Sequence, residues 1–399
     1  MIAGYLPAAR DPRRDGEHHG RRFQEGVRNN VERFLTIVDA AGWRWVDLVA
    51  AARAEALRRG TDERQRLNAI ADGAGVDRTT HLVFALTGHV VAPEECTVAA
   101  AVGRASATGS TVLLKNSDKI GADSLVGTGF HRLKEINVVI DLTSEEGVRT
   151  LGVAAAGSTN LKMGVNDAGV VAASNIARTT ELRLRRPGVD DLRAFDRGLL
   201  LRRGLEWRTA WEATTLVMKE LAHAPMATPG NIHFAGADRM FVVEGSYDRL
   251  AMELVQDRVV ARSNMFVLLD QLNDPEDRSS PARYARALAM LAPHGGSVTT
   301  EHLREVSADH GNGPGLDSIC RHSDDHRDET SLSAMIAAVD GSDPAGTRVE
   351  FALGKPCWAW SDPEGVLSVR MDDDPAVIAE RFRSGASWRR LYREDARTG

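Results

Sequence analysis

Two apolar runs with polar residues at matching ends place the strongest constraint on what this chain can fold into. Cys96-Thr97 opens the first run, which consists of small apolar residues. A glycine-bounded turn follows, and the second run leads into Lys115-Asn116-Ser117-Asp118. The pattern predicts a β-hairpin in which the end of the second strand returns beside the start of the first. Asn116 and Asp118 are therefore expected near the Cys96 thiol, and a thiol beside a carboxylate and amides indicates nucleophilic catalysis.

Composition narrows the class of protein. The 399 residues are enough for one large domain or two. The net charge of −6 comes from interspersed charges of both signs, which offers no basic field for nucleic acid or an anionic membrane. Residues 1–22 lack the apolar core of a secretory signal, and no segment is apolar enough to be expected to span a membrane. Three widely spaced cysteines suit a reducing cytoplasm rather than a disulfide framework.

The periodicity of apolar residues changes near Cys96. Residues 1–95 show helical spacing, with helices expected after Gly20, over 45–59 and after Thr61. Beyond Cys96, short strands come in hairpins and helices come in pairs. Strands are expected near 136–142, 151–156, 162–171, 231–243, 250–263, 334–339, 348–353 and 366–369, and helices near 192–201, 206–221 and 280–291. The order predicts antiparallel sheets covered by helices, an α+β fold.

Several motifs, taken in order, resemble a known family. Cys-Thr, a hairpin and then Lys-Asn-x-Asp is similar to the N-terminal nucleophile hydrolases whose nucleophile is cysteine. These include the penicillin (isopenicillin N) acyltransferases, choloylglycine hydrolases, acid ceramidases and secernins. The further segments that resemble them are Gly16 to Gly20, Gly164 to Asn175, Arg262 to Phe266, Asp317 to His322 and Gly354 to Cys357. The resemblance implies a four-layer αββα sandwich over residues 96–399, preceded by a helical prosegment, residues 1–95, that is retained as a small subunit.

The resemblance also implies a mechanism. Cys96 would attack the carbonyl carbon of Glu95, so the zymogen would cleave itself and free the α-amino group of Cys96. That amine, with an ordinary pKa of about 7.7–8.0, would serve as general base to its own thiol. Asp118 would orient the ammonium form, and Asn175 and Asn264 would donate to the oxyanion.

The resemblance assigns roles to other residues less directly. Arg283 resembles the late catalytic-site arginine of choloylglycine hydrolases, and Arg321 and Arg278 compete for that role. Lys115, Asn116 and Arg321 are the expected substrate-binding residues. Two departures stand out: Lys115 replaces an arginine, and Glu95 stands where many relatives have a small residue.

The expected activity is acyl transfer or hydrolysis at amide bonds. An acyl group would pass from a small-molecule amide, or from a thioester donor, through a Cys96 thioester to an amine or to water. The expected partners are that donor, an amine acceptor and the second cleaved fragment; homo-oligomers stay open, and no cofactor, nucleic acid or membrane is expected. A secernin-like dipeptidase and a non-catalytic binding protein are the alternative functions.

Structural explanations compete with each functional one. Cys96 could be a small buried residue, Asp118 a turn residue, Asn175 a strand terminator and Arg283 a solvated helix residue. Cys320, His322 and His326 suggest a metal site, but the charged stretch 323–329 favours a solvated loop. We therefore expect no metal. His18-His19 is likewise expected to be solvated, and Cys357 is expected in the core.

Overall fold

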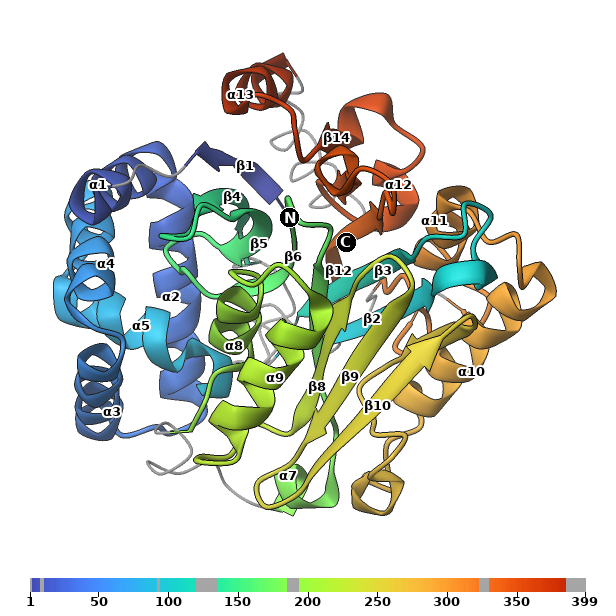
Figure 1. Cartoon of the computed structure of the whole chain (residues 1–399). Coiled ribbons are helices and arrows are strands. Elements are labelled where there is room, and N and C mark those ends of the chain that lie inside the picture. The colour runs from blue at the N-terminus through green and yellow to red at the C-terminus, as the bar shows by residue number, and fades with distance from the viewer. Residues whose placement is uncertain are drawn as a thin grey trace.

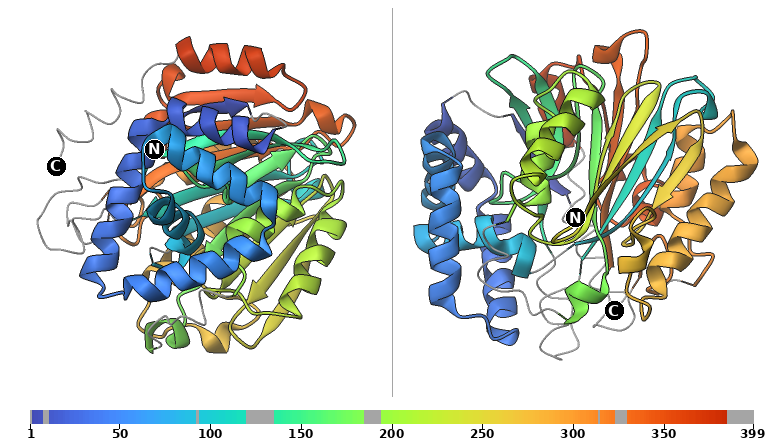
Figure 2. Two further views of the ribbon diagram at one scale, coloured as in Figure 1. Left: turned by 90° about the vertical axis from the view of Figure 1, so that its left-hand side faces the viewer. Right: turned by 60° about the horizontal axis from the view of Figure 1, so that its bottom comes forward.

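The computed structural model describes residues 2–7, 11–91, 94–119, 135–184, 194–313, 315–322 and 330–384. Two β-sheets lie face to face in these residues, and helices cover the outer face of each (Figure 1). Figure 2 shows the four layers when the view is tilted. The predicted αββα sandwich is therefore confirmed. No helix within the described ranges is long and apolar enough to cross a membrane.

The first sheet has eight strands and the second has six. In spatial order, the first is β1 (Ile2–Pro7), β4 (Asn137–Thr143), β5 (Arg149–Ala155), β6 (Leu161–Asn166), β7 (Val171–Ile176), β8 (Gly230–Ala235), β9 (Arg239–Gly245) and β10 (Leu250–Gln256). The second is β11 (Val259–Arg262), β2 (Glu95–Ala101), β3 (Val112–Lys119), β12 (Thr330–Ala338), β13 (Arg348–Ala352) and β14 (Val366–Arg370). All described pairings are antiparallel except that of β1 with β4.

Helices from the N-terminal segment form most of one outer layer. They are α1 (Pro12–Arg22), α2 (Gln24–Ala40), α3 (Trp45–Arg58), α4 (Thr61–Ala74) and α5 (Arg78–Val91). Apolar residues of α2 at helical spacing, such as Val27, Val31 and Phe34, are buried in one cluster with Ile136 and Ala156 of the first sheet. This segment therefore shares a core with the first sheet and is not a separate globule.

Most of the remaining helices complete the outer layers, whereas the last one packs beside β1 and β14 onto the cluster between the sheets. The remaining helices are α7 (Thr180–Leu184), α8 (Arg197–Gly204), α9 (Ala210–Leu221), α10 (Ser279–Leu291), α11 (Thr300–Ser307), α12 (Pro356–Ala359) and α13 (Pro375–Ser384). In Figure 1, α8 and α9 lie on the same side as α1–α5, and α10 and α11 lie on the opposite side. Leu291 and Leu303 of the latter pair pack with Ala99 and Leu114 of the second sheet.

The expected all-helical start of the chain needs one correction. Ile2–Pro7 forms β1 and pairs in parallel with β4, about 135 positions later in sequence. The segment before Cys96 thus supplies an edge strand of the eight-stranded sheet as well as helices. Such a pairing is fixed by contacts remote in sequence, and local periodicity carries no signal for it.

Candidate active site

The predicted hairpin forms from β2 and β3, and its register sorts the side chains onto two faces. Cys96 pairs with Ser117, and Glu95 pairs with Asp118. Since partners in antiparallel strands point to the same side and successive residues alternate, these two pairs face opposite ways. Val98, on the Cys96 side, belongs to the cluster between the sheets, whereas Ala99 belongs to the cluster against α10 and α11. The thiol therefore points between the sheets, and Glu95 and Asp118 point toward the helices.

The thiol opens onto a pocket shared by the N-terminal segment and the sheets. Its lining includes Cys96, Lys115 and Lys162 together with Arg33 and Phe84 of the helical segment. Glu94 also lines this pocket. Its Oε1 atom is 3.7 Å from Cys96 Sγ and 3.3 Å from Lys115 Nζ, and its Oε2 atom is 3.2 Å from Lys162 Nζ. The chain thus places its own carboxylate against the Cys96 thiol.

Burial and the two lysines set the protonation states in this pocket. Burial raises the pKa of the Cys96 thiol to about 12, although Lys115 opposes the change. Burial also disfavours the Glu94 carboxylate, but the charges of Lys115 and Lys162 hold its pKa at about 2. At neutral pH the thiol is therefore protonated and Glu94 is ionised. A thiol in this state needs a base before it can act as a nucleophile.

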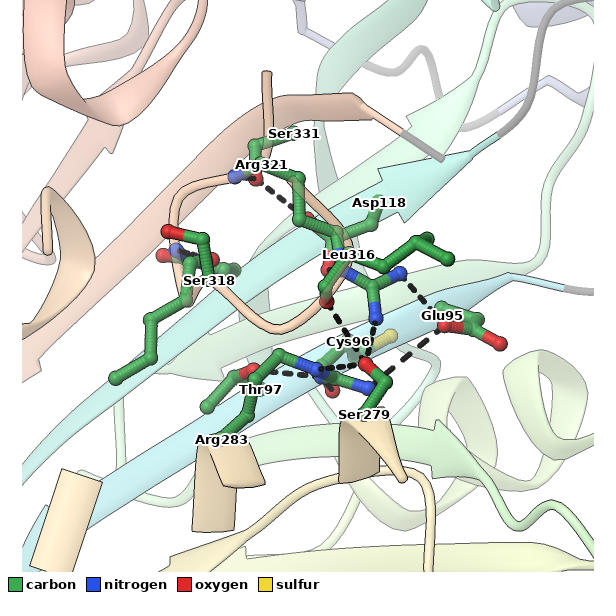
Figure 3. Close-up of polar contacts among 12 residues, drawn as sticks. Glu95, Cys96, Thr97, Asp118, Ser279, Arg283, Leu316, Ser318, Arg321 and Ser331 are labelled. Carbon is green, nitrogen blue, oxygen red and sulfur yellow. Dashed lines mark hydrogen bonds and ion pairs between the residues drawn. The ribbon is translucent and has the colours of Figure 1, made fainter. Parts of the chain in front are cut away.

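On the helix-facing side, Glu95 contacts three arginines, of which Arg283 and Arg321 are fully buried and Arg178 is exposed. Arg321 Nη1 is 2.6 Å and Arg283 Nη2 is 3.7 Å from Glu95 Oε2, and Arg178 pairs with Oε1. Dashed lines in Figure 3 run from Arg283 and Arg321 to this carboxylate. Burial would raise the pKa of Glu95, but the three cations lower it to about 2. The large acidic residue before Cys96 is therefore fully compensated in the intact chain.

Asp118 extends the same ionic group. Ser331 donates a hydrogen bond of 2.6 Å to Asp118 Oδ1, and Arg321 Nε lies 3.9 Å from Oδ2. Burial raises the pKa of Asp118, and the positive charge of Arg321 opposes this rise. No hydrogen bond joins its carboxylate to the Cys96 nitrogen in the described part of the chain. The expected role of Asp118 toward the ammonium remains a prediction.

The backbone of Cys96 has two side-chain partners. Its nitrogen donates to Asn264 Oδ1 at 3.1 Å, and its carbonyl oxygen accepts from Arg283 Nη1 at 2.8 Å. Arg283 Nη2 also donates to Asn264 Oδ1 at 2.8 Å, and Nη1 donates to Thr97 Oγ1 at 2.9 Å. Arg283 is fully buried, and burial lowers its pKa to about 10, so it stays charged at neutral pH. Asn264 and Arg283 are therefore both in contact with Cys96, and their expected catalytic roles remain predictions.

The predicted oxyanion donors are engaged elsewhere in the intact chain. Asn175 Nδ2 donates to the carbonyl oxygens of Arg262 and Ser263 at 3.3 and 3.2 Å. Asn264 Nδ2 donates to the carbonyl oxygen of Ile176 at 3.0 Å, which leaves its second hydrogen. Of the two asparagines, Asn264 thus retains the donor capacity that an oxyanion would need.

Three expectations from the sequence are wrong. Asp118 was expected beside the Cys96 thiol, but it points toward the helices, away from the side that the thiol faces. Asn116 does not lie beside the thiol: it points toward the helices, fully buried, and its Nδ2 donates to the carbonyl oxygens of Ser307 and Ile319. Strand alternation is the reason, because Asn116 sits one position away from residues that face the pocket. Arg278 is exposed at the start of α10, so Arg283 and Arg321 are the two arginines brought to the site.

Sequence reasoning missed several members of the site. Glu94 contacts Cys96, Arg178 pairs with Glu95, and Lys162 pairs with Glu94. Glu94 lies one residue before the predicted cleavage site, and this position in the sequence could have indicated that it belongs to the site. Lys162 and Arg178 come from other strands or loops, and their proximity follows only from the order of strands in the first sheet.

Comparisons with known proteins give matches among solved structures alone. No family model matches the chain, and no curated protein does. An N-acylethanolamine-hydrolyzing acid amidase ortholog from Caenorhabditis elegans aligns with 14% identity and a TM-score of 0.40, over 62% of this chain and 96% of that chain. Penicillin V acylase from Agrobacterium tumefaciens aligns with 15% identity and a TM-score of 0.41, over 69% and 86%.

A third match is a mutant of the conjugated bile acid hydrolase from Clostridium perfringens. It aligns with 12% identity and a TM-score of 0.40, over 70% of this chain and 94% of that chain. These three proteins are N-terminal nucleophile hydrolases, the group that the sequence motifs resemble. At these TM-scores the likeness transfers no activity to this chain.

Proposed function

We propose that this chain is an autoprocessed cysteine amidohydrolase or acyltransferase that acts through a Cys96 acyl thioester. The observation that carries the proposal is the environment of Cys96. Its thiol faces a pocket, and its nitrogen donates to Asn264 Oδ1 at 3.1 Å. A nitrogen held in this way and then freed by cleavage would become an oriented base beside its own thiol.

Self-cleavage would begin with attack of Cys96 Sγ on the carbonyl carbon of Glu95. Glu94, whose Oε1 atom is 3.7 Å from Sγ, is the nearest carboxylate to accept the thiol proton. The C–N bond then breaks as the Cys96 nitrogen gains a proton, which leaves a thioester between Glu95 and Sγ. Water hydrolyses this thioester, restores the thiol and gives Glu95 a free carboxylate. The step needs water alone as co-reactant.

In the mature enzyme the α-amine would replace Glu94 as the base. Its ordinary pKa of about 7.7–8.0 is close to neutral pH, whereas the pKa of Glu94 is about 2 in the intact chain. The neutral amine would accept the thiol proton, Sγ would take the acyl group, and the amine would return the proton to the leaving group. Arg283, which contacts the Cys96 carbonyl oxygen, Thr97 and Asn264, would act as a positioning residue.

The charges of the pocket favour a substrate with a negative group. Lys115 and Lys162 are both paired with Glu94 in the intact chain, and Lys162 also pairs with Glu135. If cleavage withdraws Glu94, these two buried cations lose that partner next to the thiol. A carboxylate on the acyl donor would replace it at little electrostatic cost. The proposed substrates are therefore small amides or thioesters that carry an anionic group.

Trapping the acyl enzyme tests the proposed function. Purified protein would be mixed with matched amide donors, one with a terminal carboxylate and one with its methyl ester, and the Cys96 peptide analysed by mass spectrometry. We expect the acyl adduct on Cys96, with a higher kcat/KM for the carboxylate. Lys162→Met should reduce this preference, whereas Lys219→Met, at an exposed lysine of α9, should not. An adduct on another residue, or no turnover of any amide or thioester, would contradict the proposal.

A further inference from the structure

A second group of reactive side chains lies outside the Cys96 pocket. It consists of His310, Cys320, His322 and Cys357, and one ligand atom from each lies within 4.8 Å of the others. His322 Nε2 is 3.8 Å from Cys320 Sγ and 3.0 Å from Cys357 Sγ. The His310 and His322 rings are 4.7 Å apart. His310 Nε2 is buried and has no hydrogen-bond partner among the described residues.

Two thiols and two imidazoles form a ligand set typical of tetrahedral zinc. Bond lengths of about 2.3 Å to sulfur and 2.0–2.1 Å to nitrogen give ligand separations of roughly 3.3–3.8 Å. The observed distances from His322 Nε2 are 3.0 Å to Cys357 Sγ and 3.8 Å to Cys320 Sγ, which bracket this range. All four ligand atoms lie within 4.8 Å of one another. Soft thiolates with imidazole select zinc over magnesium or calcium. Small side-chain movements would therefore bring all four atoms onto one ion.

The four residues come from three separate segments of the chain. His310 follows α11, Cys320 and His322 precede β12, and Cys357 lies in α12. Existing hydrogen bonds already hold two of these segments together, since Cys320 N donates to the carbonyl oxygen of Asp309 at 3.0 Å. His322 packs edge-on against Trp358 of α12, with ring centres 5.7 Å apart. The ligand set is thus largely formed before any ion binds.

We propose that His310, Cys320, His322 and Cys357 form a structural zinc site. Binding would release the thiol protons and leave two thiolates and two neutral imidazoles on the ion. Four protein ligands leave no open coordination position, so the site would be structural and not catalytic. The proposal does not depend on the proposed acyl-transfer function.

Arg321 connects the proposed zinc site with the candidate active site. This residue stands between the ligands Cys320 and His322, and its guanidinium reaches Glu95, Asp118 and Ser279. Zinc would fix the backbone on both sides of Arg321. It would therefore hold the segment 315–322 against the hairpin that carries Cys96.

The chain contains three cysteines, so Cys96→Ala provides a matched control. Full-length protein would be purified from zinc-supplemented medium without chelator, and its metal content measured by mass spectrometry. We expect one zinc ion per chain in the wild type and in Cys96→Ala. Zinc content should fall to background in Cys357→Ser and His322→Gln, and stay unchanged in His223→Gln, an exposed histidine outside the cluster.

Cobalt substitution makes the test independent of how the variants fold. Co²⁺ added to zinc-stripped wild-type protein should give a thiolate charge-transfer band and the intense visible bands of tetrahedral coordination. Both should be displaced by Zn²⁺. Wild-type protein that retains no zinc and gives no such bands would overturn the proposal. So would an intact mass lower by two hydrogens in Cys96→Ala, which would show a Cys320–Cys357 disulfide instead.

Discussion

The backbone nitrogen of Cys96 donates a 3.1 Å hydrogen bond to the side-chain oxygen of Asn264. The strand order explains this contact, because β11 runs beside β2 and leads directly to Asn264. Asp118 lies on β3, on the other side of β2. The intact chain therefore offers the Cys96 nitrogen an amide oxygen as its acceptor, where the sequence led us to expect a carboxylate.

Replacing Asn264 should change the properties of the proposed general base, the α-amine of Cys96. Asn264→Ala should lower kcat/KM by roughly 10–100-fold, because a hydrogen bond to a charged group contributes about 1.5–3 kcal/mol. Asn264→Asp should move the acidic limb of the pH profile to higher pH, since a nearby carboxylate stabilises the ammonium form. Asn30→Ala, which removes a buried amide from α2, should lower stability and leave the limb in place. An unchanged limb in Asn264→Asp would show that the amine lies elsewhere.

Asp118→Asn should reduce turnover at least about tenfold while changing stability little. The amide keeps the shape and the hydrogen bond from Ser331 but removes the negative charge near Arg321. Steady-state kinetics and denaturant unfolding of the same preparations would separate the two effects. Activity near the wild-type level would identify Asp118 as a hairpin residue alone.

The pH dependence of kcat/KM should report an amine and not a histidine. Burial lowers the pKa values of His19 and His233 to about 3 and that of His81 to about 4, so all three are neutral at pH 7. No described histidine has a hydrogen bond to Cys96. We therefore expect an acidic limb near pH 7–8, the ordinary range of an α-amine. Replacing His81, His89, His131, His233 and His322 one at a time should leave that limb in place.

A single replacement that removes the limb in folded protein would identify a cysteine–histidine pair instead. His131 lies outside the described residues and His322 belongs to the proposed zinc site, so circular dichroism and zinc content must accompany those two profiles. Loss of the limb in a variant that is folded and holds zinc is the contradicting result.

Acid should loosen the contact between the N-terminal helices and the first sheet. His19, expected at the surface, is buried and accepts a 3.0 Å hydrogen bond from Gly157 N, so its neutral form is required. Its folded pKa of about 3 lies below the unfolded value of about 6.5. Its stabilisation is therefore complete above pH 6.5 and is lost as the pH falls toward 3.

Protonation of Glu63 should lower the free energy of unfolding further at lower pH. Burial opposes its charge, but Arg202, Arg59 and Arg66 lower its pKa to about 2, against about 4.3 when unfolded. Urea midpoints should therefore fall steadily from pH 6.5 to pH 3 and further below. His19→Gln should flatten the upper part of this dependence, and His223→Gln should not. Equal slopes in wild type and His19→Gln would contradict the assignment.

Local patterns predicted the elements that depend on neighbouring residues. The β2–β3 hairpin and helix α10 lie close to their expected ranges, because alternation and capping signals are local. β1 was missed since its partner β4 is remote in sequence. α11 was also missed, because its apolar residues contact the second sheet, whose position the sequence does not fix.

The sequence predicted many of the residues that form the candidate site, but it did not predict how their side chains are arranged. Cys96, Asp118, Asn264, Arg283 and Arg321 do come together at one end of the hairpin. Which face each side chain takes depends on register, and a shift of one residue exchanges the faces. The sequence could not fix the register, so Asn116 and Asp118 were both placed beside the thiol. The cluster of His310 and Cys357 with Cys320 and His322 joins segments that no regular spacing connects.

Intact mass spectrometry of freshly purified protein tests the central claim most directly. The account predicts two fragments in the wild type, with one ending at Glu95 and the other starting with Cys96-Thr97, and a single full-length chain in Cys96→Ala. N-terminal sequencing of the larger fragment fixes the position of the break. A wild-type protein that remains full length while turning over an amide would contradict the account, because Cys96 would then act without a free α-amine.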